Sequence, residues 1–222
     1  MDEKQLAVLE QEVKENPKSI FAHHRLAIAY WQAGKLEEAI NTFRKLFELD
    51  PPNFEARINF GTLLAQMGHL EEAKKQFEYA LKSYPSSPEA LINLGLVHFH
   101  LGELKEAKDC YLRALEALEK MKADPEISAK KEVKIQAAEL SLLVNLSTIY
   151  VEEGDFEKAI ECCQKALEKD PNLALAYNNL AVALHYAGRS EEARRALLKA
   201  KDLGYPVPED LEKMILGQDV QG

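Results

Sequence analysis

The sequence predicts an all-α fold, a right-handed α-solenoid in which pairs of helices repeat along the chain. Five glycines follow one another at intervals of 34, 34, 52 and 34 residues: Gly34, Gly68, Gly102, Gly154 and Gly188. The same residue types also recur at fixed distances from them, with an alanine five residues after every one: Ala39, Ala73, Ala107, Ala159 and Ala193. A fixed period of this length is typical of stacked repeats, in which each unit buries its apolar face only against its neighbours.

Each period predicts two helices separated by its glycine. In the first period, apolar residues at helical spacing run from Phe21 to Ala33 and again from Leu36 to Phe47. Gly34 stands where the end of a helix favours left-handed backbone, which a residue without a Cβ adopts freely. Asp50-Pro51 then ends the second helix, because proline disfavours a helical residue before it.

This pattern resembles the tetratricopeptide repeat (TPR) family. The matching features are the 34-residue period, the glycine, the small residue, the closing proline and a ring nine residues after the glycine, present as Phe43, Phe77 and Tyr111. The tryptophan often found near the start of such repeats is absent. The resemblance covers roughly residues 20–207. It implies a solenoid that presents surfaces to other proteins.

The predicted repeats cover residues 20–53, 54–87, 88–120, 140–173 and 174–207. Residues 1–19 are predicted to form an N-terminal capping helix, equivalent to half a repeat, with Leu6, Leu9 and Val13 on one face. Residues 208–222 are predicted to form a C-terminal capping helix, Glu209–Leu216, whose Leu211, Met214 and Ile215 cover the last repeat, and a frayed tail, Gln218–Gly222. Terminal repeats need such lids over their outer faces.

The interval of 52 residues places a helical insert at residues 121–139. Asp124 is predicted to cap a helix that begins with Pro125. We expect the insert to lengthen both flanking helices, each by about 2–3 turns. Two interpretations stay open: a tolerated protrusion without a role, or a locally basic arm for a partner or a second subunit.

Composition limits the classes of function. The net charge of −9 disfavours nucleic acid, whose phosphates require a basic surface. The chain has no apolar run of membrane-spanning length and its start lacks the features of a signal peptide, so we expect no membrane insertion and a cytoplasmic location. No nucleotide-binding loop or nucleophile elbow occurs, so we expect no enzyme, no catalytic residues and no cofactor.

Cysteine and histidine have structural interpretations. Cys110, Cys162 and Cys163 are expected to be buried thiols of a reducing compartment, with a redox switch as the alternative for the adjacent pair. The histidine pairs lack the i, i+3 or i, i+4 spacing of helical metal ligands, so no metal site is expected. His98 occupies a position that holds tyrosine in two other repeats, and we expect it to be packed and hydrogen-bonded.

The candidate site follows from the resemblance, because the first helix of each pair lines the concave side in this family. Residues 13, 10, 9, 6, 3 and 2 positions before each glycine are expected to lie outside the core. Four of five residues nine positions before the glycine are asparagine, and an amide complements a peptide group. The predicted peptide-binding residues are Arg25, Asn59, Asn93, Asn145, Asn178, Asn179, Phe99, His100 and Tyr186. Alternatively, the asparagines form hydrogen bonds across the interfaces between repeats.

The sequence therefore predicts a non-enzymatic adaptor that binds a peptide segment of a partner protein in the concave groove. The alternative is a structural scaffold that self-assembles into a homo-oligomer through the insert or the convex face. Family members that grip a terminal carboxylate use lysines that are missing here. Glu55 and Glu89 stand in the groove instead, so such a clamp is not expected.

Overall fold

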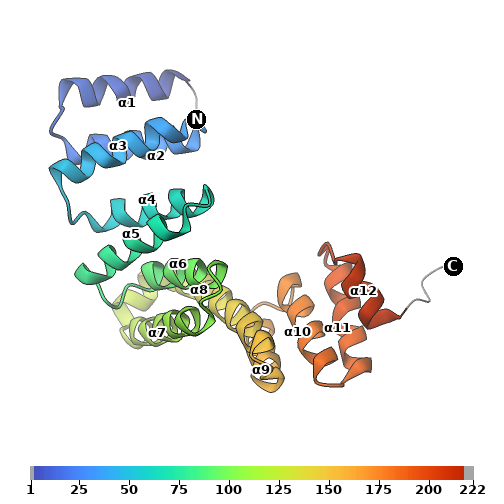
Figure 1. The fold of residues 1–222 in the computed structure, drawn as a ribbon. Coiled ribbons are helices and arrows are strands. Elements are labelled where there is room, and N and C mark those ends of the chain that lie inside the picture. Colours follow the sequence, from blue (N-terminus) through green and yellow to red (C-terminus); the bar gives the residue numbers. More distant parts are fainter. Residues whose placement is uncertain (1–2, 218–222) are drawn as a thin grey trace. The chain divides into compact units, whose positions relative to one another are not determined.

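The computed structural model describes residues 3–217, and within that range the regular structure consists of twelve α-helices without a strand (Figure 1). The all-helical prediction and the predicted number of helices are confirmed. The chain divides into two compact units, the N-terminal unit, Met1–Cys110, and the C-terminal unit, Tyr111–Gly222, and each is considered by itself. The predicted tail, residues 218–222, lies outside the described residues.

Helices in the N-terminal unit begin with α1, followed by pairs. Their bounds are α1 Glu3–Glu15, α2 Ile20–Gln32, α3 Leu36–Leu49, α4 Phe54–Gln66, α5 Leu70–Ser83, α6 Pro88–His100 and α7 Leu104–Ala123, which continues into the C-terminal unit. The other helices are α8 Pro125–Glu152, α9 Phe156–Lys169, α10 Ala174–Tyr186, α11 Ser190–Asp202 and α12 Glu209–Leu216. We call α2, α4, α6, α8 and α10, which precede the five turn glycines, the leading helices.

The repeated residues form the core as the periodicity predicts. All five alanines that follow the glycines are fully buried, and so are the rings of Phe43, Phe77 and Tyr111. Gly34 has a φ of 74°, and the Lys35 amide donates to the carbonyl of Tyr30 at 2.9 Å, which closes the end of α2. In each repeat, the chain therefore reverses direction at the glycine, and the helices pack closely at the small residue.

A second, non-turn glycine explains how closely two helices approach. Gly61 lies in the middle of α4, and a Cβ at this position would stand 2.8 Å from the ring of Phe77 on α5. Such a contact is too short for a real side chain. The absence of a Cβ therefore lets the Phe77 ring lie directly against the backbone of α4.

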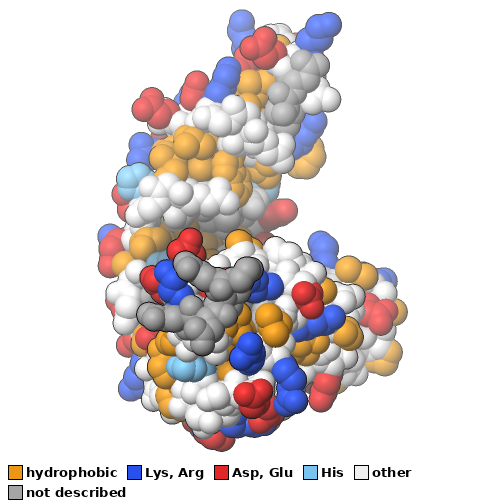
Figure 2. Space-filling view, turned by 90° about the vertical axis from the view of Figure 1, so that its right-hand side faces the viewer, with side chains coloured by type: hydrophobic (Ala, Val, Ile, Leu, Met, Phe, Trp, Pro, Cys, Tyr) orange, Lys and Arg blue, Asp and Glu red, His pale blue; other side chains and the backbone are white. Residues whose placement is uncertain are grey.

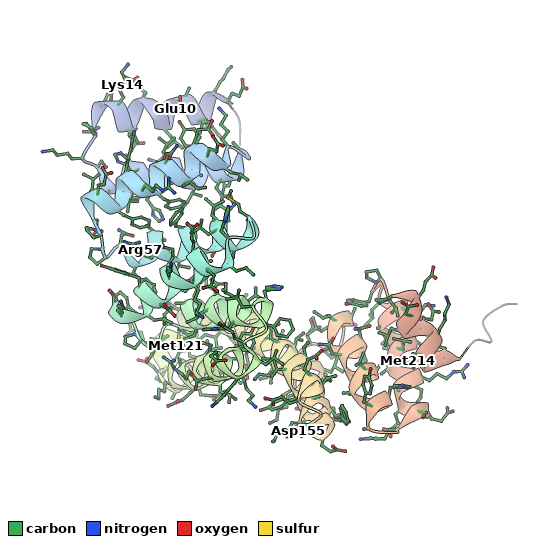
Figure 3. The ribbon with its side chains drawn as sticks, viewed as in Figure 1. Glu10, Lys14, Arg57, Met121, Asp155 and Met214 are labelled. Carbon is green, nitrogen blue, oxygen red and sulfur yellow. The ribbon has the colours of Figure 1, made fainter. Side chains whose placement is uncertain are left out.

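Helix α1 packs on α2 through Leu6 and Leu9. Glu10, labelled on α1 in Figure 3, accepts a hydrogen bond from the hydroxyl of Tyr30 at 2.9 Å. Burial and this carboxylate raise the pKa of Tyr30 to about 12. At the other end of the chain, α12 packs on the last repeat through Leu211 and Ile215. Met214, expected to share this role, is exposed.

The insert lengthens both flanking helices, but unequally. Helix α7 has 20 residues against 14 in α3, whereas α8 has 28 against 13 in α2. The expectation of similar extensions is therefore wrong, because α8 receives most of the insert. The reason is the start of α8: Asp124 accepts hydrogen bonds from the amides of Glu126 and Ile127, and Pro125 stands at the first turn, as predicted.

A buried carboxylate holds the extended part of α8 in place. Glu139 is buried and forms ion pairs with Lys122 on α7, at 2.6 Å, and with Lys169 on α9, at 3.1 Å. Burial opposes ionisation of Glu139, but the two ammonium groups outweigh it and keep the pKa of this carboxyl below its ordinary value. The extension is thus tied to two helices of the C-terminal unit.

Candidate functional site

The candidate surface consists of the residues nine, six, three and two positions before each turn glycine, which we call the leading-helix face. In the N-terminal unit two hollows open on it. The α1–α2 hollow has a volume of about 460 Å³ and is lined by Gln5, Val8, Leu9, Arg25, Ile28 and Ala29. The α4–α6 hollow has a volume of about 260 Å³ and is lined by Thr62, Ala65, Gln66, Leu70, Phe77, Asn93, Leu96, Val97 and His100. Apolar side chains gather in the upper part of Figure 2, at the height of α1 to α5 in Figure 1.

The predicted row of asparagines divides into two kinds. The Asn59 amide nitrogen lies 3.0 Å from Nε2 of His24 on the preceding leading helix, and a neutral His24 accepts this hydrogen bond. The Asn179 amide donates to the hydroxyls of Ser147 and Thr148 on α8, both at 3.1 Å. The interface interpretation therefore holds for Asn59 and Asn179.

Asn93 and Asn145 differ from these two residues. Within residues 3–217 neither amide has a hydrogen-bond partner, although both residues are half-buried. Asn93 also lines the α4–α6 hollow. These two amides are therefore available to a ligand.

Arg25 lies at the rim of the α1–α2 hollow. Its guanidinium forms an exposed ion pair with Glu12 on α1, at 2.9 Å, and lies 5.4 Å from the centre of the Phe21 ring. The Glu12 carboxylate compensates its charge, so Arg25 does not give this end of the face a free cation.

The prediction that residues ten positions before the glycine lie outside the core is wrong at Ile58, Val144 and Asn178, which are all buried. The residues three positions further on are small and buried, as at Gly61 and Ala181. Neighbouring leading helices therefore approach closely and cover the side chains of this position. Asn178 is only 8% exposed, so the prediction that it lies on the exposed face is wrong.

Asn178 and Asn179 are expected to respond to substitution in opposite directions. The side-chain oxygen of Asn178 is buried without a hydrogen-bond partner in the described structure, and valine occupies the equivalent position at Val144. An unsatisfied buried acceptor costs about 1–3 kcal/mol, so Asn178→Val should raise the free energy of unfolding by about 1 kcal/mol. Asn179→Val, the matched control, should lower it by a similar amount. Urea unfolding measures both, and equal destabilisation would contradict the assignment.

The predicted aromatic residues remain accessible. His100 lines the α4–α6 hollow and is exposed, and the Phe99 ring meets it edge-on at 5.9 Å between ring centres. In the C-terminal unit, the half-exposed Tyr186 stacks on Phe156 with ring centres 5.6 Å apart. All three rings are placed where a ligand can contact them, and their role in binding stays a prediction.

Acidification is expected to destabilise the N-terminal unit through His24. Burial lowers the pKa of His24, and the Glu55 carboxylate offsets part of that shift. The unfolded state, with a pKa of about 6.5, then binds more protons than the folded state, so stability is complete above about pH 6.5 and declines as the pH falls towards the lowered pKa. Urea unfolding followed by fluorescence of Trp31, the single tryptophan, measures this at two pH values.

The control variant is His24→Gln, which keeps an acceptor for Asn59 and does not titrate. It should lose this part of the pH dependence. If it keeps the whole difference between about pH 7.5 and about pH 5.5, the dependence comes from another group.

His98 is packed and hydrogen-bonded, as predicted. It is buried, and its Nδ1 contacts the Glu103 carboxylate, which also accepts from Lys74 at 2.8 Å. Lys74 and His98 hold the pKa of Glu103 below its ordinary value. The histidine therefore has a partner within the fold.

The adjacent thiols are poorly suited to redox chemistry. Burial raises the pKa of Cys162 to about 11 and that of Cys163 to about 12. Both are therefore protonated at neutral pH, whereas thiol exchange requires the thiolate. In residues 3–217 no group of three His, Cys, Asp or Glu side chains is placed to hold a metal ion. The helices of that range also include none that is long and apolar enough to cross a membrane.

The α4–α6 hollow was not foreseen from the sequence. The sequence feature that indicates this hollow is the residue three positions before the glycine. It is larger in the other repeats, as Trp31, Phe99, Val151 and His185, but is Ala65 in the second repeat. The sequence predicts α1 only as a cap, and it therefore does not predict the α1–α2 hollow.

Family models match most of the repeat region. Models described as tetratricopeptide repeat match residues 58–122, 30–78 and 174–203, and one described as TPR repeat matches residues 148–188. Among curated proteins, Photosystem I assembly protein Ycf3 of Acaryochloris marina (strain MBIC 11017) is 38% identical over 60 residues, which are 27% of this chain and 36% of that protein. The chain thus spans about a third of the length of this relative.

Solved structures share the fold. YrrB, described as a TPR protein with an unusual peptide-binding site, has a TM-score of 0.67 at 24% identity, covering 89% of this chain and 93% of that one. MamA has a TM-score of 0.65 at 23% identity, covering 80% and 94%. PilF of Pseudomonas aeruginosa has a TM-score of 0.68 at 19% identity, covering 90% and 86%. These likenesses confirm the predicted class, an all-α solenoid.

Proposed function

Because the chain belongs to the tetratricopeptide repeat family, we propose that it is a non-enzymatic adaptor whose leading-helix face binds a segment of another protein. Stacked repeats present extended surfaces, and this one combines apolar side chains with amides that lack an internal partner. The observation that carries the proposal is Asn93, whose free amide borders the α4–α6 hollow beside Leu96, which is 40% exposed.

The chemistry of this face suits a polypeptide. The Asn93 amide offers a donor and an acceptor, the two groups that a peptide bond requires. The apolar side chains beside it gain free energy when a ligand removes them from water. In the C-terminal unit, Asn145 offers the same free amide, and Tyr186 offers an exposed ring.

The test compares free asparagines with bonded ones. A partner captured from the source organism and identified by mass spectrometry is titrated against variants of the chain. Asn93→Ala and Asn145→Ala, tested one at a time, should each weaken binding to the unit that carries the asparagine by about two- to tenfold, because the lost hydrogen bond contributes about 0.5–1.5 kcal/mol. The melting temperature should change little, since these amides have no partner to lose.

Asn59→Ala and Asn179→Ala, also tested one at a time, are the matched controls. These substitutions remove hydrogen bonds between repeats, so they should lower the melting temperature more than the first two variants do. Wild-type affinity in both of the first two variants would remove the asparagines from the binding model.

Self-assembly is the second candidate, favoured by one observation. Val133 on the extended part of α8 is 81% exposed, more than any other large apolar side chain in residues 3–217, and Ile127 on the same part is also exposed. Light scattering over a range of protein concentrations shows whether the chain self-assembles. A dimer that Val133→Asp abolishes supports a scaffold, whereas a monomer at all concentrations argues against it.

A further inference from the structure

The α4–α6 hollow owes its existence to one small side chain. The residue three positions before the turn glycine is Trp31 on α2 and Phe99 on α6, but on α4 it is Ala65. Ala65 and the neighbouring Gln66 both line the hollow. A methyl group thus stands where the adjacent repeats carry rings.

Trp31 shows where a large side chain at this position extends. Its indole nitrogen donates to the Gln66 side chain on the next leading helix, at 3.0 Å, so the ring bridges α2 and α4. One repeat later, the equivalents of Trp31 and Gln66 are Ala65 and His100. A ring at residue 65 would therefore lie across towards His100, through the space that is hollow here.

The walls of this space are apolar and its rim is polar. Phe77 and Val97 are almost fully buried and form its inner wall, and the part-exposed Leu96 forms a side. Gln66, Asn93 and His100 supply polar groups. At about 260 Å³ the hollow is smaller than the roughly 300–1,000 Å³ of pockets for drug-sized ligands, so it suits one side chain better than a whole small molecule.

Charge near the hollow is negative. Glu55 and Glu89 are exposed in the first turns of α4 and α6 and precede Thr62 and Leu96 by seven residues. This separation is about 10 Å along a helix, or about three residues of extended chain. None of the residues lining the hollow is lysine or arginine. A ligand with a basic side chain is therefore favoured over an acidic one.

We propose that the α4–α6 hollow is a specificity pocket for one large aliphatic or aromatic side chain of a partner protein segment. The same segment carries a lysine or arginine about three residues away, opposite Glu55 and Glu89. This inference rests on the proposed function and specifies its ligand. The Asn93 amide binds the backbone beside the inserted side chain, which explains why a free amide stands at the rim.

The test begins with random twelve-residue peptides displayed on phage and selected on the wild-type chain. The selected consensus is synthesised with an amidated C-terminus and titrated by calorimetry. We expect a central leucine, methionine or phenylalanine with a nearby basic residue. Replacing the central residue with alanine should weaken binding at least tenfold, because its burial supplies much of the affinity.

Ala65→Trp should block the pocket with a side chain that the neighbouring repeat already accommodates. We expect at least tenfold weaker binding of the same peptide. The matched control is Leu198→Trp, which adds the same ring at an exposed position of α11, outside the leading-helix face, and should leave affinity unchanged. Leu96→Arg, at an exposed site on the pocket wall, provides a second block if the first variant unfolds.

A further variant tests the basic residue. Glu55→Gln combined with Glu89→Gln should weaken binding and reduce its dependence on salt. Glu71→Gln combined with Glu72→Gln, in the first turn of α5, is the control pair and should have no effect.

Three outcomes would overturn the inference. Peptides that bind Ala65→Trp as tightly as wild type do not use the pocket; if Asn93→Ala still weakens them, the proposed function stands without it. If the selection yields no binding peptide, both the specificity pocket and the proposed function are contradicted. A concentration-dependent dimer that Ala65→Trp abolishes would show that the occupant is a second copy of the chain.

Discussion

Replacing Phe77 with alanine is expected to lower the free energy of unfolding of the N-terminal unit by about 3–5 kcal/mol. The Phe77 ring is almost fully buried, lies against the backbone at Gly61 and belongs to the largest apolar cluster of this unit. Its removal leaves a cavity that neighbouring helices fill poorly, because they already pack at close distance. Urea unfolding followed by Trp31 fluorescence reports on this unit specifically, since Trp31 is the single tryptophan.

Phe99→Ala is the matched control for this prediction. It removes the same side chain from a half-buried position on the leading-helix face, so the loss of stability should be much smaller. A loss below about 1 kcal/mol in Phe77→Ala would show that the helices around Phe77 rearrange to close the cavity.

Glu139→Gln is expected to destabilise the C-terminal unit by about 1–3 kcal/mol. Removing one partner of a fully buried ion pair costs about 3–5 kcal/mol, but the side chains of Lys122 and Lys169 are 31% and 35% exposed and retain contact with water. Urea unfolding followed by circular dichroism measures the change. The control is Glu132→Gln, which neutralises an exposed carboxylate on the same helix, α8, and should change stability by less than about 0.5 kcal/mol.

The same substitution has a defined dependence on pH. Because the folded state lowers the pKa of Glu139, its stabilising effect is complete above the unfolded pKa of about 4.3 and is lost as the pH falls through the lowered value. The difference in stability between wild type and Glu139→Gln should therefore be constant near neutral pH and shrink below about pH 4. A difference that persists at lower pH would mean that the carboxylate charge is not responsible.

The helices and their core positions could be predicted from the sequence because they follow local rules. A glycine with a left-handed turn, a small residue five positions later and a closing proline act within one repeat. Ala39 and Phe43 are accordingly buried as expected. The cap at Asp124 is equally local, since it depends on the residues that directly follow it.

The candidate site depends on pairs of neighbouring repeats, and there the sequence prediction failed in part. Asn59 is hydrogen-bonded because the preceding repeat offers His24, while the preceding repeat offers Asn93 no such partner. Asn178 is buried because the spacing of two helices, which one repeat does not determine, covers it. Comparing each asparagine with the residues about 31–35 positions earlier would have separated the bonded amides from the free ones.

The α7–α8 junction has a consequence for proteolysis. Between Leu104 and Glu152, Asp124 is the single described residue outside a helix. Insertions usually give proteases a loop, but here the lysines at 130, 131 and 134 lie within α8, where the backbone does not fit an extended protease cleft. Trypsin therefore cleaves after these lysines only when this segment has unwound. The rate of tryptic cleavage at these lysines therefore measures how often the ion pairs of Glu139 break and this part of α8 unwinds. The insert thus reports on local unfolding of the C-terminal unit.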